Sequence, residues 1–229
     1  MNSARDVILG RIRAAIGGTS SRRGFQQDTP RGYRRRGTRN PRELLDLLHA
    51  RIEDYQALVV RSGSRDLPEN IARRLASREA TRVVVPPDLP DAWLEEGAQG
   101  GLEVSRDSVP RVLSKDEVSS AQAVLTGCAL AIAETGTLIM NGGVGQGRRS
   151  LTLLPDYHLC VVFAHQVVET VPEAVDAMKA MDAMSHTEAG KWPPLTLISG
   201  PSATSDIELI RVEGVHGPRT LDVILVEDQ

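Results

Sequence analysis

The chain has 229 residues, a formal net charge of −3 and 41% apolar residues, so it can bury a core of ordinary size. Residues 1–42 carry a net charge of +9 from eleven Arg and two Asp, which leaves −12 on residues 43–229. The negative charge argues against nucleic-acid binding by residues 43–229, because phosphate contacts need Lys and Arg. Aromatic residues, which stack on bases, make up only 3% of the chain.

The N-terminal region is predicted to hold one helix followed by a basic arm. Apolar residues recur at helical spacing from Ser3 to Ile16, and two glycines end the pattern. Residues 19–40 show no periodicity and combine seven Arg with Gly, Ser and Gln, a composition typical of a mobile or peripherally docked segment. We interpret this arm as a solvated connector, or alternatively as a binding surface for an anion or an acidic partner.

Helical and strand patterns alternate from Pro41 onward. Helices are predicted at 41–55, 68–78, 91–98, 114–120 and 170–184, and strands at 57–61, 82–85, 102–105, 159–164, 195–199 and 221–226. Ser114 with Glu117 and Thr170 with Glu173 have the spacing of capping boxes. The last helix is predicted to turn four apolar side chains toward the core: Val171, Val175, Met178 and Met181.

This alternation indicates a single α/β domain with a largely parallel sheet flanked by helices. We place it at residues 43–229, after an N-terminal segment of residues 1–42. Cys128 and Cys160 lie in apolar surroundings, form no CxxC pair and are too few to hold a zinc ion or an iron–sulfur cluster. No apolar run approaches the roughly 20 residues that span a bilayer, and no signal-peptide pattern is present, so we expect a cytoplasmic protein without a membrane segment.

Glu134 is the candidate catalytic residue of the first polar segment. Together with Thr135, Gly136 and Thr137 it separates two apolar stretches, which indicates a sharp bend at the end of a buried strand. Ligand sites of α/β proteins lie at strand ends, and partial burial would raise the pKa of a carboxylate there, which suits acid–base or nucleophilic chemistry. The alternative is that Glu134 accepts backbone N–H groups and only fixes the turn.

A glycine-rich loop with basic flanks spans residues 141–150. Its backbone N–H groups at positions such as Gly147, together with the side chains of Arg148, Arg149 and Ser150, can cradle a phosphate or carboxylate. The loop lacks the Lys-Ser/Thr ending of a P-loop and the GxGxxG spacing of a dinucleotide fold. A hairpin tip with basic flanks is an equally good interpretation.

Residues 197–208 read as a strand, a Gly-Pro turn and hydroxyl-rich residues that open a helix. Ser205 and Glu208 have capping-box spacing, and the free N–H groups of such a helix start can bind an anion. The candidate anion-binding residues here are Gly200, Ser202, Thr204, Asp206 and Glu208. The alternative is that these polar side chains only cap the helix.

His216, next to Gly217 in residues 212–218, is the second candidate catalytic residue. A histidine between glycines can move protons near neutral pH, although a turn-stabilising role is the alternative. The other histidines show no metal-ligand spacing, so no metal site is expected: His49, His158, His165 and His186.

Four motifs together resemble the lactate utilization protein C family, whose module is the LUD domain. They are AETGT at 133–137, GxGRRSLTLLPxxH at 145–158, ISGPSxTSDIE at 198–208 and GVHGP at 214–218, in the family's order. The opening helix and basic arm also look similar, so the resemblance covers nearly the whole chain. It marks the following residues: Glu134, Thr135, Gly136, Thr137, Gly147, Arg149, Ser150, Gly200, Pro201, Ser202, Thr204, Asp206, Glu208, His216 and Gly217.

The resemblance implies an α/β fold of the NagB/RpiA/CoA-transferase type. It also implies a part in the oxidation of L-lactate to pyruvate, with iron–sulfur partner proteins of a lactate utilization operon. One position departs from the family, because Ala203 stands where a longer polar residue is usual. If that side chain helps to hold an anion, Arg148 or Arg149 must replace it, or the ligand differs.

Composition and resemblance together predict a non-redox subunit. The chain has no cluster ligands, no dinucleotide fingerprint and no flavin loop, so we expect it to bind no cofactor and the partner proteins to carry the iron–sulfur clusters. The expected ligand is a small carboxylate or a phosphorylated compound. Two alternatives use the same residues: a stand-alone transferase or isomerase for a phosphorylated or CoA-linked small molecule, with Glu134 as nucleophile or base, and a ligand-binding scaffold that contacts a partner through the arm.

Overall fold

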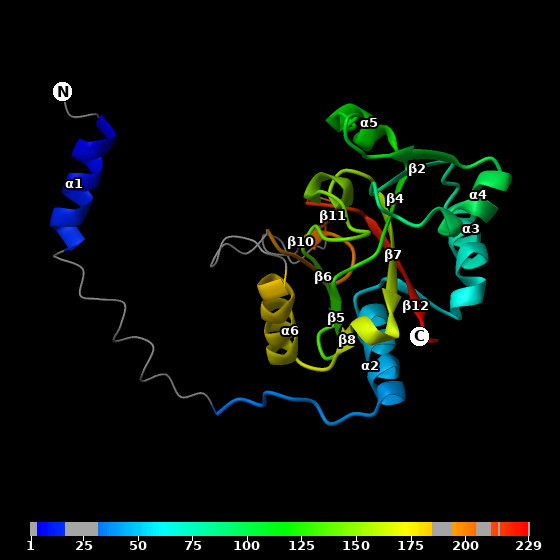
Figure 1. Ribbon diagram of the computed structural model, residues 1–229, viewed down its shortest axis with the longest axis horizontal. Helices are drawn as coiled ribbons and strands as arrows, with labels where there is room; N and C mark the ends of the chain where they lie inside the picture. Colours follow the sequence, from blue (N-terminus) through cyan, green and yellow to red (C-terminus); the bar gives the residue numbers. More distant parts are fainter. Residues whose placement is uncertain (1–3, 17–31, 185–193, 205–211, 215, 229) are drawn as a thin grey trace. The chain divides into compact units, whose positions relative to one another are not determined.

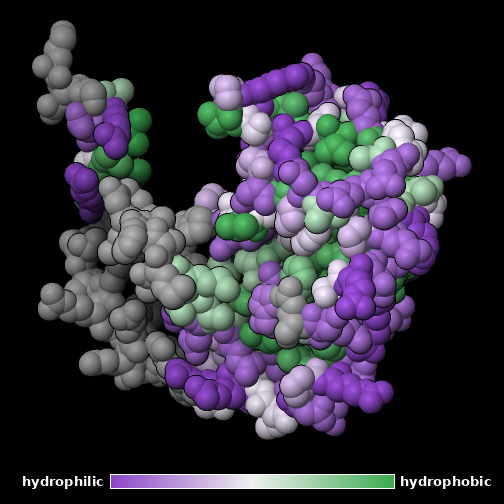
Figure 2. Space-filling model, turned by 45° about the vertical axis from the view of Figure 1, so that its right-hand side comes forward, coloured by the Kyte–Doolittle hydropathy of each residue, from purple (hydrophilic) through white to green (hydrophobic). Residues whose placement is uncertain are grey.

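The computed structural model describes residues 4–16, 32–184, 194–204, 212–214 and 216–228 (Figure 1). The chain divides into two units, Met1–Arg34 and Arg35–Gln229, and we call the second unit the body. In the first unit, α1 (Ala4–Ile16) confirms the predicted helix. Figure 2 shows apolar side chains along one side of this helix and polar ones along the other, and Val7, Ile8 and Ile12 on the apolar side are exposed.

A six-stranded sheet in which every neighbouring pair is parallel lies at the centre of the body. Its order is β1 (Leu58–Ser62), β12 (Thr220–Val226), β7 (Tyr157–Phe163), β4 (Ala123–Thr126), β2 (Arg82–Val85) and β3 (Glu103–Arg106). The inner strands are nearly continuous apolar runs because both faces of the sheet are covered. The predicted α/β fold with a largely parallel sheet is therefore confirmed.

Helices cover one face of this sheet. In α3 (Leu67–Ser77), Leu67, Ile71 and Leu75 recur every four residues and pack against apolar side chains of the inner strands, together with Leu94, which directly precedes α4 (Glu95–Gln99). The predicted helix at 91–98 is divided, because a 3₁₀ turn at Asp91–Trp93 precedes α4. A short helix, α5 (Lys115–Ser120), begins at the predicted Ser114 capping box and lies on the opposite face, where Val118 packs with Val84 and Val124.

The other face is covered by α2 (Pro41–Asp54) and by a second, four-stranded sheet (Figure 1). The order of the second sheet is β8 (Val167–Val168), β5 (Leu130–Ile132), β6 (Thr137–Met140) and β9 (Thr196–Ile198). Side chains alternate along β5, so that Ala131 faces the six-stranded sheet whereas Leu130 and Ile132 face α6 (Val171–Met184). The strands β4, β5, β6 and β8 are absent from the sequence prediction.

The prediction for the buried face of α6 is half wrong. Met178 is buried and Met181 is partly buried, but Val171 and Val175 are 46% and 40% exposed. Ala174 and Ala177 occupy the place expected for the valines, because their small side chains let the helix lie close to the second sheet. Glu173 and Thr170 do form the predicted capping box.

The last residues of the basic arm belong to the body and are hydrogen-bonded to Glu169 and Glu173. The N–H groups of Thr38 and Arg39 each donate to a Glu169 carboxylate oxygen at 2.8 Å, and the Arg39 guanidinium donates to its second oxygen at 2.6 Å. Gly37 N–H donates to Glu173 at 3.0 Å. For these residues the structure supports a docked segment; residues 17–31 of the arm lie outside the described residues. No described helix is long and apolar enough to cross a membrane.

Candidate functional site

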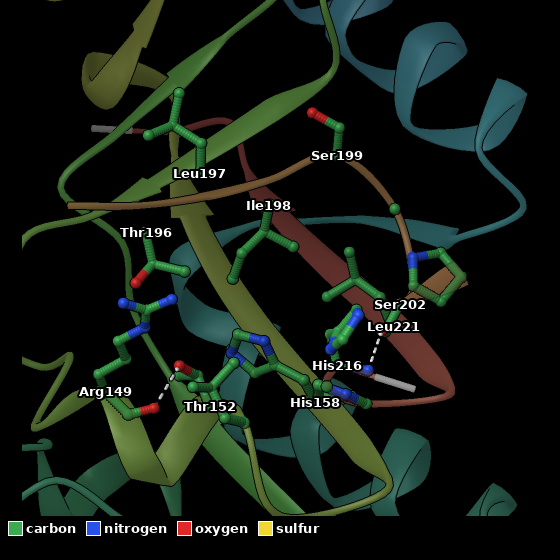
Figure 3. A pocket seen from close by; sticks show the side chains of 15 residues that line it. Arg149, Thr152, His158, Thr196, Leu197, Ile198, Ser199, Ser202, His216 and Leu221 are labelled. Carbon is green, nitrogen blue, oxygen red and sulfur yellow. Dashed lines mark hydrogen bonds between the residues drawn. The ribbon is translucent and has the colours of Figure 1, made fainter. Parts of the chain in front are cut away.

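A pocket of about 330 Å³ opens beside the amino ends of β7 and β12 (Figure 3). Its wall comes from four chain segments: residues 149–153, the start of β7 at His158, residues 196–202 and residues 216–221. Three of the four sequence motifs that suggest function therefore meet at one cavity. The volume is within the range usual for small-molecule sites.

Backbone hydrogen bonds join the third and fourth motifs. Ser202 N–H donates to the Pro218 carbonyl at 2.8 Å, and His216 N–H donates to Ser202 Oγ at 3.1 Å. The next residues pair as antiparallel strands, β10 (Ala203–Thr204) with β11 (Val212–Glu213). The described residues after the Gly-Pro turn thus lead into a strand, and the helix expected after them lies outside the described residues. The expected capping box of Ser205 and Glu208, and Asp206 between them, lie outside the described residues, as does the side chain of Thr204.

The two neighbouring arginines have different surroundings. Arg148 Nε donates to Asp107 Oδ2 at 2.7 Å, and Arg148 Nη2 donates to the Leu113 carbonyl at 2.5 Å. Arg149, which begins the 3₁₀ turn η3 (Arg149–Thr152), lines the pocket. Among the described residues no carboxylate lies within ion-pair distance of its guanidinium, so Arg149 supplies positive charge to the cavity. Figure 3 also shows Thr152 Oγ1 donating to the Arg149 carbonyl, at 3.2 Å.

Backbone N–H groups of the glycine-rich loop donate hydrogen bonds to side chains of the protein. Gly145 N–H donates to Asp88 at 3.0 Å, Asn141 N–H to Gln146 at 2.7 Å and Gly143 N–H to Asn141 at 3.0 Å. Gly147 and Arg148 line a second pocket of about 480 Å³, and Arg149 and Thr152 line both pockets. Ser150 Oγ is buried and has no hydrogen-bond partner among the described residues.

Glu134 does not line the 330 Å³ pocket. It lies in the turn of the antiparallel β5–β6 hairpin, and its N–H donates to the Glu169 carbonyl at 3.1 Å. The predicted bend exists, but it closes a hairpin of the second sheet and not a strand of the parallel sheet. Thr137 is closer to the pocket, because its hydroxyl oxygen is 2.7 Å from that of Ser199 and 2.7 Å from that of Thr135.

Two glycines hold the first and third motifs against the end of α2. Gly136 has a φ of +59°, and a Cβ added there would be 2.7 Å from the Arg51 carbonyl oxygen. Gly200 has a φ of +80°, and a Cβ added there would be 2.5 Å from the Cβ of Tyr55. Both positions therefore exclude a side chain through backbone conformation and through space. Gly200 and Gly217 also line the pocket.

His158 lines the pocket although the sequence did not suggest it as a site residue. It is only 1% exposed, and its Nε2 is 2.8 Å from Thr126 Oγ1 on the neighbouring strand β4. The available signal was a polar residue next to a buried apolar run, at the last position of the second motif. Metal-ligand spacing was the wrong criterion for it, and the described residues contain no cluster of three or more metal-ligating side chains.

Comparison with known proteins identifies relatives over most of the chain. The family model described as "LUD domain" matches residues 37–226. Lactate utilization protein C of Deinococcus radiodurans is 49% identical over 184 residues, which cover 80% of each chain. Lactate utilization protein C of Anoxybacillus flavithermus is 24% identical over 230 residues, which cover 96% of this chain and 95% of that protein. A crystal structure of a DUF162 family protein from Deinococcus radiodurans superposes with a TM-score of 0.67 at 41% identity, over 82% of this chain and 99% of that one.

Proposed function

The chain belongs to the LUD domain family, and from this premise we propose that it works in lactate utilization, as a component of the system that oxidises L-lactate to pyruvate. The names of its relatives support the process. The ligand class is supported by one observation: the Arg149 guanidinium on the wall of a 330 Å³ pocket has no carboxylate partner among the described residues. A guanidinium binds a carboxylate through two parallel hydrogen bonds, which suits lactate or pyruvate.

The subunit we propose binds the small carboxylate and does not carry electrons. Oxidation of lactate releases two electrons and two protons, and we assign the electrons to iron–sulfur proteins that act with this chain. The two cysteines support this division, because both are buried and free, and two thiols are too few to ligate a cluster.

The alternative, a stand-alone transferase with Glu134 as nucleophile, has less support. Such a nucleophile must reach the bound substrate, and Glu134 is in the β5–β6 turn and not among the residues that line the pocket. A phosphorylated ligand remains compatible with Arg149, but the described residues that line the pocket include no second arginine or lysine.

An anaerobic pull-down tests the partnership. The tagged full chain is recovered from lactate-grown cells of its own source, and the eluate is assayed for iron–sulfur absorbance and for lactate-dependent dye reduction. We expect both signals to accompany the chain. Elution of the chain alone and inactive would contradict the proposed subunit.

A matched pair of arginine variants tests the pocket in the same cells. Arg149→Ala is expected to abolish growth on lactate while the chain remains folded. Arg111→Ala is the control, because Arg111 is 81% exposed and pairs with Glu117 away from the pocket. Normal growth of the Arg149 variant would remove this pocket from the function.

A further inference from the structure

We propose that His158 is a second ligand-binding group of this pocket and that it selects carboxylates with a hydroxyl group on the neighbouring carbon. This inference rests on the proposed function, because it assumes that the pocket lined by Arg149 is the ligand site. It adds the residue that recognises the hydroxyl group of lactate and so distinguishes lactate from pyruvate.

The argument begins with how the imidazole ring is held. His158 is on β7, Thr126 is at the end of β4, and the two strands pair in parallel. The ring is 1% exposed, and its Nε2 is 2.8 Å from Thr126 Oγ1. A buried ring that is hydrogen-bonded at one nitrogen has a fixed orientation, and the bond at that nitrogen determines which tautomer forms.

A short chain of hydrogen-bonding groups around Nε2 accommodates the tautomer that is protonated at this nitrogen. The Thr126 hydroxyl is placed to donate to Cys160 Sγ at 4.0 Å, and the Cys160 thiol to donate to the Val161 carbonyl at 3.9 Å. Thr126 has one hydroxyl proton, so when it donates to the sulfur its oxygen accepts from His158 Nε2–H. In this arrangement, which the inference adopts, Nδ1 carries a lone pair; if Thr126 donates to Nε2 instead, Nδ1 carries the proton.

Nδ1 is left for the ligand. It makes no hydrogen bond to another described residue, and the ring lines the same cavity as Arg149 (Figure 3). A lone pair that faces the cavity can accept a hydrogen bond from water or from a ligand donor. When the carboxylate of a ligand is bound by Arg149, a hydroxyl group on the next carbon can supply that donor. Lactate offers this O–H group, whereas pyruvate offers only an acceptor oxygen and propionate offers nothing.

Thr126 is therefore a positioning residue. Two substitutions distinguish the effect of its hydroxyl group from the effect of its side-chain volume. Thr126→Val keeps the shape and removes the hydroxyl, whereas Thr126→Ser keeps the hydroxyl. The purified full chain and both variants are titrated calorimetrically with L-lactate, pyruvate and propionate. We expect the unmodified chain to bind L-lactate about tenfold more tightly than the other two, the preference to vanish in Thr126→Val and to survive in Thr126→Ser.

Nitrogen NMR of the imidazole gives a readout that needs no ligand. At pH 8 the His158 signals are expected to report protonated Nε2 and bare Nδ1 in the unmodified chain and in Thr126→Ser, and a mixture of tautomers in Thr126→Val. Protonated Nδ1 in the unmodified chain would overturn the inference, and so would equal affinity for lactate and propionate or for lactate and pyruvate. If none of the three acids binds, the inference fails while the pull-down still decides the proposed function.

Discussion

Thr137 and Ser199, 62 positions apart in the chain, have their hydroxyl oxygens 2.7 Å from each other. Thr137 is 5% exposed on β6, and its oxygen also lies 2.7 Å from that of Thr135. Ser199 directly follows β9 and lines the pocket. This hydroxyl chain connects the first motif to the wall of the candidate pocket, so the TGT residues support that wall without lining it.

Breaking this chain is expected to weaken the second sheet. Thr137→Val keeps the side-chain volume but leaves Thr135 and Ser199 without their shared partner, and we expect the free energy of unfolding to fall by about 1–2 kcal/mol. Ser199→Ala is expected to cost less because Ser199 is exposed. Denaturant unfolding of both single variants and the double variant measures the coupling, and strictly additive effects would show that the bond contributes nothing.

Substitutions at two glycines with similar backbone conformations allow the cost of backbone strain to be measured apart from the cost of steric contact. Gly200 and Gly101 have φ values of +80° and +87°, but a Cβ at Gly101 meets nothing within 4 Å whereas one at Gly200 meets Tyr55 at 2.5 Å. Gly101→Ala is therefore expected to cost about 1 kcal/mol from the left-handed backbone alone. Gly200→Ala is expected to cost more and also to weaken binding at the pocket. Equal melting temperatures for the two variants would mean that Tyr55 moves aside freely.

The elements with clear local signals are those that the sequence predicts well. The strand at 82–85 has the predicted bounds, and the capping boxes at Ser114 and Thr170 mark the starts of α5 and α6. The residues 123–140 were harder, because three short buried strands follow one another without a polar face to give a period. Their pairing partners include β8 and β9, which come later in the chain.

The candidate site could be predicted where its residues lie in local motifs, and not where long-range strand pairing positions them. Arg149, Ser202 and His216 meet at the pocket. Strand order and long-range hydrogen bonds such as His216 N–H to Ser202 bring them together. The co-occurrence of the motifs suggests such a meeting, but no single motif does. Glu134 is outside the pocket lining because it lies in the β5–β6 turn, whereas the second sheet lines the pocket through β9. No local pattern shows that this sheet exists. His158 was missed because β7 begins at Tyr157, two residues before the predicted strand.

A buried charge cluster fastens α3 to the six-stranded sheet. Asp222 on β12 is 0% exposed and accepts hydrogen bonds from Arg74 at 2.5 Å, from Arg78 at 2.9 Å and from the Tyr157 hydroxyl at 3.0 Å. The hydrogen bond to Asp222 raises the pKa of Arg78, although burial opposes it. Burial, together with the charge of Asp222, raises the pKa of Tyr157.

Removing the Asp222 charge is expected to destabilise the chain. Asp222→Asn leaves two arginines beside a neutral group, and we expect the free energy of unfolding to fall by about 3 kcal/mol in denaturant titrations. Glu69→Gln is the control, because its ion pair with Arg73 joins side chains that are 66% and 62% exposed. It is expected to change stability by less than about 1 kcal/mol. A cost for Asp222→Asn as small as that of the control would show that the cluster adds little to stability.

Docking of the basic arm is expected to depend on pH through Glu169. The backbone N–H of Arg39, then that of Thr38, and the Arg39 charge lower the pKa of Glu169 from the usual 4.5, while burial opposes them. A carboxyl with a lowered pKa in the docked state stabilises docking above its ordinary pKa, and this contribution is lost as the pH falls through the lowered value. We therefore expect residues 37–39 to stay docked at pH 5 and above and to be released below pH 4.5.

Amide proton NMR of Thr38 and Arg39 measures this release. Both amides are hydrogen-bonded to the carboxylate, so their shifts should move together toward unbound values with a midpoint below 4.5, the ordinary pKa of the group. In Glu169→Gln the amides should already have unbound shifts at pH 7 and should not titrate, because the neutral amide is a weaker acceptor and cannot pair with the Arg39 guanidinium. Glu103→Gln, a change of an exposed glutamate on β3, is the control and should titrate like the unmodified chain. A midpoint above 4.5 would contradict the lowered pKa of Glu169. Bound shifts in Glu169→Gln would show that the side chains of Glu173 and Thr170 hold the arm without Glu169.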